Sequence, residues 1–358
     1  MLRIKIKASD QKINLDRIYI TVNNVPIYGK SGINIRDKNI QNWEEDISVQ
    51  LSRGKNKITL SVLNIGGAES LLETIIITYD APPTKPNLYL IGLGVNDFIG
   101  SELDLSYPIK DIQDIVDLYQ NQTDLYHHIF IDTLFDQSIS IAKIKNLKTK
   151  LQQSKVDDHI LFFVAGHGIL DINFNYYFAT PNTNFDKPSI NSIPYEELEN
   201  LLDEIPARYK LFLMDACHSG EIDKDNISLE NKLDSPLKEQ VKFRSTGNRP
   251  VHKQVGLYNS FELMKELFVD LRRGTGASII SSASGVEFAW EGDQWKNSVF
   301  TYALLSGLKE KKADLNNDGA IMISELQKYL AMQVSKLTNN QQQPTMRIEN
   351  ISNDWRVW

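Results

Sequence analysis

The sequence feature that most constrains the fold is an apolar run that ends in a short polar segment. Residues Lys210 to Gly220 read K-L-F-L-M-D-A-C-H-S-G, and Cys217 is the only cysteine of the chain. A short apolar run between polar residues is typical of a strand that is buried on both faces of a sheet. Cys217 follows this run, and open α/β sheets place their functional groups at the carboxyl ends of strands. The stretch therefore predicts a reactive position on an α/β scaffold.

A second stretch has the same design. Residues His159 to Leu170 read H-I-L-F-F-V-A-G-H-G-I-L, so an apolar run again ends around a polar side chain, here His167. If the two strands are parallel neighbours, His167 and Cys217 reach the same edge of the sheet, where an imidazole serves as general base for a thiol nucleophile. The rival base, His218, is a poor partner for Cys217 because neighbouring strand residues point to opposite faces.

The G-H-G and D-A-C-H-S-G segments, each after an apolar strand, resemble the caspase-like cysteine peptidases, and within them the metacaspase and bacterial caspase-like branch. The 50 residues from His167 to Cys217 match the caspase spacing. The resemblance covers roughly Asn87 to the C-terminus. It implies the caspase-hemoglobinase fold, with a mainly parallel six-stranded sheet flanked by helices. It also implies a Cys217–His167 dyad, with the N–H groups of Gly168 and Cys217 as oxyanion donors.

The residue two positions before the cysteine departs from true caspases, which have glutamine where this chain has Asp215. Strand alternation puts positions 215 and 217 on the same face, so this carboxylate would attract a cationic substrate side chain. Metacaspases use the position in this way, and the resemblance implies cleavage after Arg or Lys. Asp97 and Glu291 are further acidic candidates for the specificity pocket. The alternative is a buried Asp215 that only holds a loop by hydrogen bonds.

The chain divides into an all-β part and an α/β part. Residues 1–80 contain short strand-like runs separated by Asn and Gly turns, which predicts a small β-sandwich, and they resemble the Ig-like modules that precede some bacterial caspase-like domains. Three prolines in residues 81–86 predict a semi-rigid linker. Residues 87–358 alternate strands with helices, as in βαβ units. We expect the sandwich either to dock a regulatory protein or to act as a spacer.

Residues 221–260 interrupt the α/β pattern. They have few apolar residues and no sustained period, which predicts a long loop. Caspase-like enzymes often hold a cleavable linker at this place, so the resemblance implies self-cleavage at a basic residue. A solvated surface loop is the alternative. The candidate cleavage residues are Lys242, Arg244, Arg249 and Lys253.

Residues 314–325 read D-L-N-N-D-G-A-I-M-I-S-E and match the EF-hand loop pattern. The candidate Ca²⁺ ligands are Asp314, Asn316, Asp318 and Glu325. Only two of the first three ligand side chains are carboxylates, so a modest affinity is expected. A turn followed by a helix cap is the alternative.

Composition limits the classes of function. The net charge of −7 argues against a general nucleic-acid-binding protein, which would have a basic surface. No run of about 18 apolar residues is present, so no membrane span is expected. A single cysteine cannot form an intrachain disulfide, which favours a reducing, cytoplasmic setting.

The sequence therefore predicts a cysteine endopeptidase that cleaves proteins after Arg or Lys and needs no cofactor for its chemistry. Activation is expected through self-cleavage, a ligand or Ca²⁺, and the resemblance implies a role in bacterial cell death or phage defence. Two alternatives stay open at this point. One is a catalytically silent scaffold or binding module, and the other is a caspase-type enzyme that cleaves after Asp.

Overall fold

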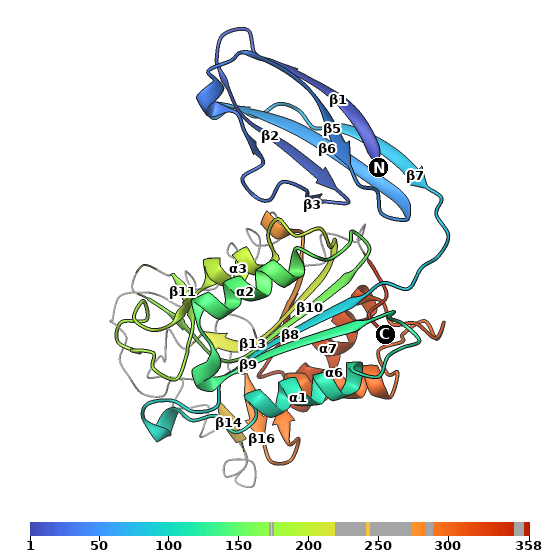
Figure 1. Ribbon diagram of the computed structural model, residues 1–358. Helices are drawn as coiled ribbons and strands as arrows, with labels where there is room; N and C mark the ends of the chain where they lie inside the picture. The colour runs from blue at the N-terminus through green and yellow to red at the C-terminus, as the bar shows by residue number, and fades with distance from the viewer. Residues whose placement is uncertain (172, 174, 219–240, 244–273, 284–288, 347–353) are drawn as a thin grey trace.

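A computed structural model places a β-sandwich next to a larger α/β part (Figure 1). It describes residues 1–171, 173, 175–218, 241–243, 274–283, 289–346 and 354–358.

Two antiparallel sheets form the sandwich. The first pairs β1 with β5, and the second has the order β3-β2-β6-β7 with β4 also paired to β2. Alternate side chains of both sheets, such as Ile18, Ile58 and Ile47, meet in one core, as expected for facing sheets. The predicted all-β sandwich is confirmed, while its Ig-like character stays a prediction. The strands are β1 (Leu2–Ser9), β2 (Leu15–Val22), β3 (Val25–Pro26), β4 (Ile33–Asn34), β5 (Asn42–Val49), β6 (Gly54–Asn64) and β7 (Glu73–Tyr79).

The α/β part is built on a sheet of eight described strands. Five of them are parallel, in the order β9-β8-β10-β13-β15, and short antiparallel strands extend this core. The sequence predicts six strands; the structure adds β12 and β18, whose two residues each are too short to show a period. The strands are β8 (Leu88–Gly94), β9 (Ile129–Phe135), β10 (His159–Leu170), β11 (Tyr176–Phe178), β12 (Ile193–Pro194), β13 (Tyr209–His218), β15 (Ser278–Ser281) and β18 (Thr345–Met346).

Helices cover both faces of this sheet (Figure 1). The strand β10 explains why, because Ile160 and Phe162 pack in the core beneath α2 and α3, whereas Leu161 and Phe163 pack in the core beneath α1, α6 and α7. The predicted α/β fold is therefore confirmed. The helices are α1 (Pro108–Tyr119), α2 (Ile141–Leu151), α3 (Tyr195–Leu202), α6 (Val299–Lys309) and α7 (Ile323–Leu337), with 3₁₀ helices η1 (Arg36–Lys38), η2 (Ser101–Leu103) and η3 (Asp136–Ser138).

Two local expectations differ from the structure. The sequence suggests Ser192 as the cap of a helix, but α3 begins at Tyr195, and the Ser192 hydroxyl lies 3.0 Å from that of Thr183 instead. The long loop expected at 221–260 also contains a short strand, β14 (Val241–Phe243), in a three-stranded sheet with β16 (Trp290–Gly292) and β17 (Asn297–Ser298). The partner of Ser192 lies nine positions earlier, and the partner strand of β14 lies almost 50 positions later, so neither feature follows from the residues next to it.

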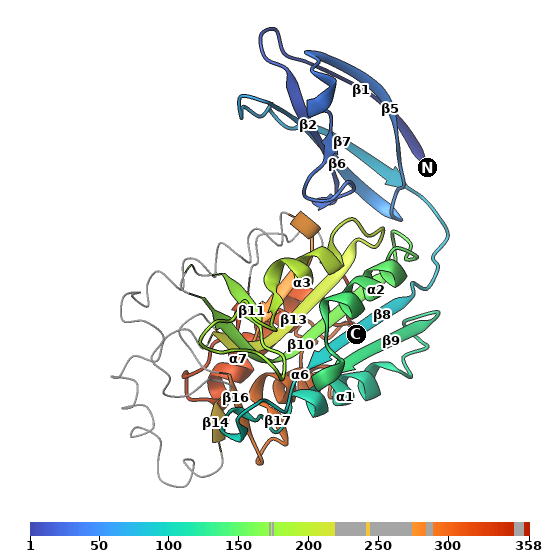
Figure 2. The same ribbon diagram turned by 60° about the vertical axis from the view of Figure 1, so that its left-hand side comes forward.

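The sandwich contacts the α/β part at the amino ends of the parallel strands. Arg208, the residue before β13, is buried, and its guanidinium donates to the Ser52 hydroxyl at 2.9 Å and to the Gln50 carbonyl at 2.5 Å. Burial lowers the pKa of Arg208 to about 10. Figures 1 and 2 both show the sandwich at this end of the sheet.

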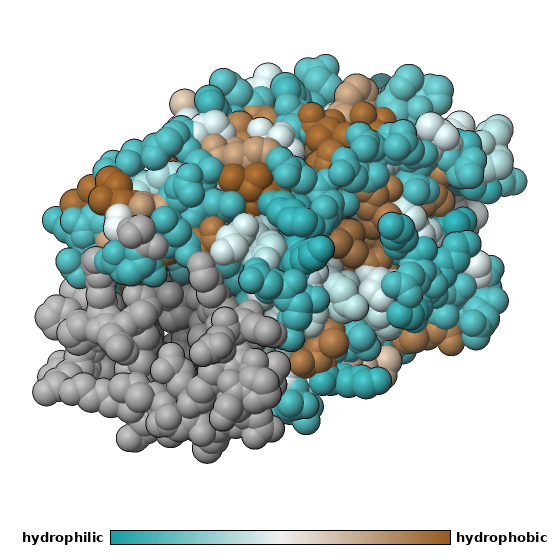
Figure 3. Space-filling model, turned by 90° about the horizontal axis from the view of Figure 1, so that it is seen from below, coloured by the Kyte–Doolittle hydropathy of each residue, from teal (hydrophilic) through white to brown (hydrophobic). Residues whose placement is uncertain are grey.

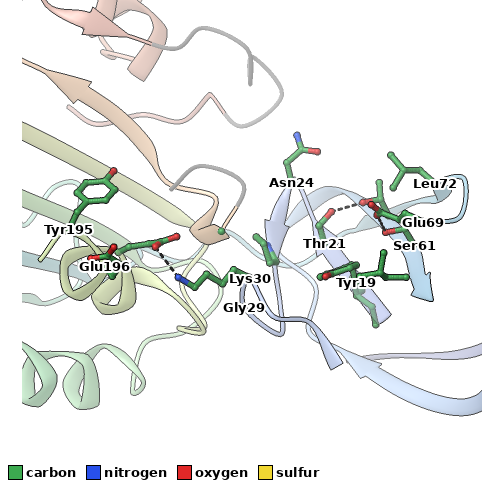
Figure 4. A pocket seen from close by; sticks show the side chains of 16 residues that line it. Tyr19, Thr21, Asn24, Gly29, Lys30, Ser61, Glu69, Leu72, Tyr195 and Glu196 are labelled. Carbon is green, nitrogen blue, oxygen red and sulfur yellow. Dashed lines mark hydrogen bonds and ion pairs between the residues drawn. The ribbon is translucent and has the colours of Figure 1, made fainter. Parts of the chain in front are cut away.

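A second contact bridges the sandwich and α3. The Lys30 ammonium lies 3.0 Å from a carboxylate oxygen of Glu199, and Figure 4 shows Lys30 pointing across the gap. The two residues line an open cleft of about 1010 Å³ between the sandwich and α3. The sandwich is therefore docked rather than simply tethered by the linker.

The described surface is mixed in hydropathy. Seen from below, hydrophobic residues form separate patches among hydrophilic ones (Figure 3). None of the helices in the described ranges has the length and apolar character needed to cross a bilayer. Several exposed hydrophobic side chains lie on the sandwich, among them Leu71 and Ile76.

Candidate active site

The strands that carry the predicted nucleophile and base are adjacent and parallel. Their register sets His167 of β10 directly opposite Cys217 of β13. Because neighbouring strands lie roughly 4.8 Å apart, the two positions are neighbours at the carboxyl edge of the sheet. The apolar runs before them are buried between the two helical layers. β13 ends one residue after Cys217, whereas β10 continues to Leu170 and pairs there with β11.

The imidazole of His167 is held by a backbone carbonyl. Its Nε2 lies 2.8 Å from the carbonyl oxygen of Leu103, at the end of η2. A carbonyl can only accept a hydrogen bond, so Nε2 carries a proton and, in the neutral ring, Nδ1 is the basic nitrogen. The sequence offered no third member for the predicted dyad, and it could not have revealed the contact with Leu103, because a main-chain carbonyl has no residue signature.

Aromatic packing fixes the same ring. The centroid of Phe98 lies 4.8 Å from that of His167, and Phe185 packs edge-on at 6.1 Å. The side chain of His167 is buried, with 1% of its surface exposed. The segment after β8 and the loop that carries Phe185 therefore hold the imidazole in one orientation.

The glycines beside His167 serve the fold. Gly166 has φ +153°, and a Cβ there would lie 3.1 Å from the ring of Phe178. Both the backbone conformation and the packing against Phe178 therefore disfavour a side chain at this position. Gly168 follows His167 in β10 and lies opposite His218 in the register. Its role as an oxyanion donor with Cys217 stays a prediction.

Asp215 is fully buried two residues before Cys217. One carboxylate oxygen accepts hydrogen bonds from the hydroxyls of Ser298 and Thr301, the latter at 3.3 Å. Ser298 also caps α6, since its hydroxyl accepts from the Thr301 N–H at 2.9 Å. The carboxylate therefore lies at the positive end of the α6 dipole and helps to hold this helix. Its role in binding a substrate cation stays a prediction.

The other two acidic candidates lie in different settings. Glu291 of β16 is fully buried and accepts the Ser106 N–H at 2.7 Å, which ties β16 to the segment after β8. Asp97 is exposed in that segment, and its own N–H donates to Asp136 at 3.2 Å. Nearby, burial raises the pKa of Tyr107 to about 12, helped by its hydrogen bond to Asp293. The specificity roles of Asp97 and Glu291 stay predictions.

The EF-hand-like loop is closed by its own hydrogen bonds. Asp314 accepts the N–H groups of Asp318 and Gly319 at 3.1 and 2.9 Å, and the Asn316 amide donates to Asp318 at 3.1 Å. Glu325 reaches back to the Met322 N–H at 3.0 Å, as a helix-capping residue does. In the part of the chain that the structure describes, no three His, Cys, Asp or Glu side chains are grouped to hold a metal. The arrangement fits the turn-and-cap alternative, and Ca²⁺ binding is untested.

Of the four predicted self-cleavage residues, one lies within the described residues. Lys242 lies in β14, where the register sets it opposite Glu291. Arg244, Arg249 and Lys253 lie outside the described residues. Cleavage at any of these residues stays a prediction.

Comparison with known proteins identifies the family. A family model described as a caspase domain matches residues 90–354, well over half of the chain. A crystal structure of a protein from Geobacter sulfurreducens is 16% identical, with 73% of this chain and 93% of that chain covered, at a TM-score of 0.47. At this level the likeness adds nothing to the family match. No curated protein matches the sequence. The chain therefore belongs to the caspase-domain family, and its α/β part is a domain of the cysteine-peptidase class.

Proposed function

We propose that the protein is a cysteine endopeptidase that cleaves after Arg or Lys, with Cys217 as nucleophile and His167 as general base. The observation that carries the proposal is the register of β10 and β13, which sets the two residues opposite each other. The hydrogen bond from Nε2 to the Leu103 carbonyl adds to it, because it leaves Nδ1 as the nitrogen that can take a proton.

The chemistry follows from these two groups. His167 takes the proton of the Cys217 thiol, and the thiolate attacks the scissile carbonyl. The tetrahedral oxyanion is bound by the N–H groups of Gly168 and Cys217. His167 then gives its proton to the leaving amine, so that an acyl-enzyme remains. A water molecule loses a proton to His167, attacks the thioester and releases the acid together with the thiol.

Acidic groups support a preference for basic substrates. Asp215 is buried on the same strand as Cys217, and Glu291 is buried where β16 meets the segment after β8. A hydrogen bond between a carboxylate and a substrate guanidinium or ammonium group is charge-assisted and therefore stronger than a bond between neutral groups. The pairing of β14 with β16 sets Lys242 opposite Glu291, so a basic residue of this chain already lies beside one of these acidic positions.

A peptide assay tests the proposal. With a fluorogenic substrate that ends in Arg, Cys217→Ala and His167→Ala should each lower kcat/KM by at least about 10³-fold, since each removes an essential group. His218→Ala is the matched control, because this histidine neighbours Cys217 on the same strand; it should retain activity within about tenfold. Both the Arg and the Asp versions of the substrate should be compared.

The outcomes separate the alternatives. Cleavage of the Arg substrate that depends on Cys217 supports the proposal. Preferential cleavage of the Asp substrate would instead show a caspase-type specificity. Cleavage of neither substrate, in protein shown by circular dichroism to be folded, would leave the scaffold alternative.

A further inference from the structure

The strand β7 ends the larger sheet of the sandwich. It pairs with β6 on one side, and no described strand pairs with it on the other. Figure 1 shows it at the side of the sandwich, where the chain leaves for the α/β part. Its outer edge therefore presents a row of backbone N–H and C=O groups that can pair with another strand.

The side chains of β7 leave apolar surface uncovered. The exposed fractions are 58% for Ile76, 38% for Ile75 and 44% for Tyr79. Ile75 pairs in register with the fully buried Ile58 and so belongs to the core-facing row, yet it is not covered. The facing sheet explains this, because it has only two strands, β1 and β5, and does not extend over β7.

This edge lacks the features that protect sheet edges. Natural edge strands usually carry lysine, proline or a bulge, which discourage pairing with another chain. Residues 73–79 read E-T-I-I-I-T-Y and contain neither lysine nor proline, and their pairing with β6 has no register shift. An open, regular and apolar edge of this kind is expected to have a strand partner.

The order of residues in β7 points to the partner. The segment T-I-I-I-T reads the same in both directions around Ile76. We propose that two copies of this chain associate by antiparallel pairing of β7 with β7, about a twofold axis at Ile76. Each Ile75 then lies opposite Ile77 of the second copy, and each Thr74 lies opposite Thr78. Such β-branched pairs stabilise antiparallel sheets, and a twofold contact makes each of them twice.

Charge placement agrees with this register. Glu73 is the only charged residue of β7, and the pairing sets it opposite Tyr79 of the second copy. Like charges are therefore kept from facing each other across the strands. The interface lies on the sandwich and does not involve Cys217 or His167, so it is independent of the proposed cleavage.

Sedimentation of the full chain tests the dimer, in a Cys217→Ala background that cannot cleave itself by the proposed chemistry. At about 100 µM we expect a mass of twice the 40.8 kDa chain. Ile76→Lys puts two lysines opposite each other on the axis and should raise the dimer dissociation constant at least about tenfold. Ile65→Lys is the matched control, since Ile65 is 50% exposed in the turn after β6 and should leave the dimer intact.

A mixing experiment guards against simple misfolding. Ile76→Lys and Ile76→Glu should each be monomeric alone, but a mixture of the two should associate, because opposite charges then face each other on the axis. Misfolded variants would not recover in this way. A wild-type chain that stays monomeric, or a dimer that Ile76→Lys leaves unchanged, would overturn the proposal.

Cysteine cross-linking tests the register. In the Cys217→Ala background, Ile76→Cys provides the only thiol of the chain. Two such thiols facing across the axis meet the distance that a disulfide requires, so oxidation should give covalent dimers. Leu71→Cys is more exposed, at 90%, but lies off the axis and should cross-link far less. Equal cross-linking of both variants would contradict the proposed axis.

Discussion

At the scale of single residues, the setting of His167 shows how the fold fixes the orientation of the proposed general base. The ring is fixed on one side by the Leu103 carbonyl and on its faces by Phe98 and Phe185. The strand that carries His167 could be predicted from the sequence, because the apolar run before it has a clear pattern. The partners of the imidazole could not, since two are aromatic rings from other loops and one is a backbone atom.

Asp215 supports α6 through its hydrogen bonds, and the proposed function gives it a second role in substrate specificity. Asp215→Asn separates them, because asparagine keeps an oxygen for Ser298 and Thr301 but loses the charge. If the carboxylate binds the substrate cation, kcat/KM for an Arg substrate should fall about 100-fold, as expected for loss of one partner of a buried charge pair. Activity on the neutral isostere citrulline should change little, and so should the melting temperature.

The control is Ser298→Ala, which removes a hydrogen-bond donor of Asp215 without removing the charge. It should lower stability while the ratio of Arg to citrulline cleavage is kept. If Asp215→Asn leaves that ratio unchanged, the aspartate only supports α6.

At the scale of elements, length decides what could be predicted. The long buried strands β10 and β13 have apolar runs that leave few alternatives. The strands β12 and β18 have two residues each. Their pairing is therefore set by the neighbouring strand and not by the hydrophobic pattern of their own residues. The same holds for the start of α3, because Ser192 finds a partner in Thr183 that lies nine positions earlier.

The loop between α6 and α7 carries the element-scale prediction. If it binds Ca²⁺, excess Ca²⁺ should stabilise the protein by about 2.7 kcal/mol at 100 times the dissociation constant, and EDTA should reverse this. Asp318→Ala should abolish the shift in melting temperature. The acidic control is Glu310→Ala, at the end of α6, which removes an exposed carboxylate outside the loop. If Ca²⁺ does not raise the melting temperature of the wild-type protein, the turn-and-cap alternative is supported.

At the scale of the whole molecule, Lys210 joins segments that lie far apart in sequence. Its ammonium is fully enclosed and donates to the carbonyls of Leu202 and Thr275 at 2.8 and 2.9 Å. Burial lowers the pKa of Lys210 to about 7, from 10.5. The sequence could not show this, since it presents Lys210 only as the polar start of an apolar run.

The lowered pKa predicts a pH dependence of stability. Between pH 7 and 10.5 the unfolded chain binds the proton that the folded chain has lost, so the free energy of unfolding should rise with pH. The slope from this group is at most about 1.4 kcal/mol per pH unit. Urea unfolding of the Cys217→Ala chain should give a higher free energy of unfolding at pH 9 than at pH 7. Adding Lys210→Met should reduce this difference. The control Lys143→Met removes an exposed lysine of α2 and should show the same difference as the parent chain. An equal difference in all three proteins would contradict the titration of the buried Lys210.

The docking of the sandwich could not be predicted from the sequence either, because its contacts join residues more than 100 positions apart, as Ser52 and Arg208 do. These contacts lie at the amino ends of the strands, and Cys217 is nine residues further along β13, roughly 30 Å away. The positions of His167 and Cys217 therefore lie at the opposite end of the strands from these contacts with the sandwich. A substitution in the sandwich can therefore alter the surface of the sandwich and its contact with Arg208, while the sheet edge that carries positions 167 and 217 keeps its strand register.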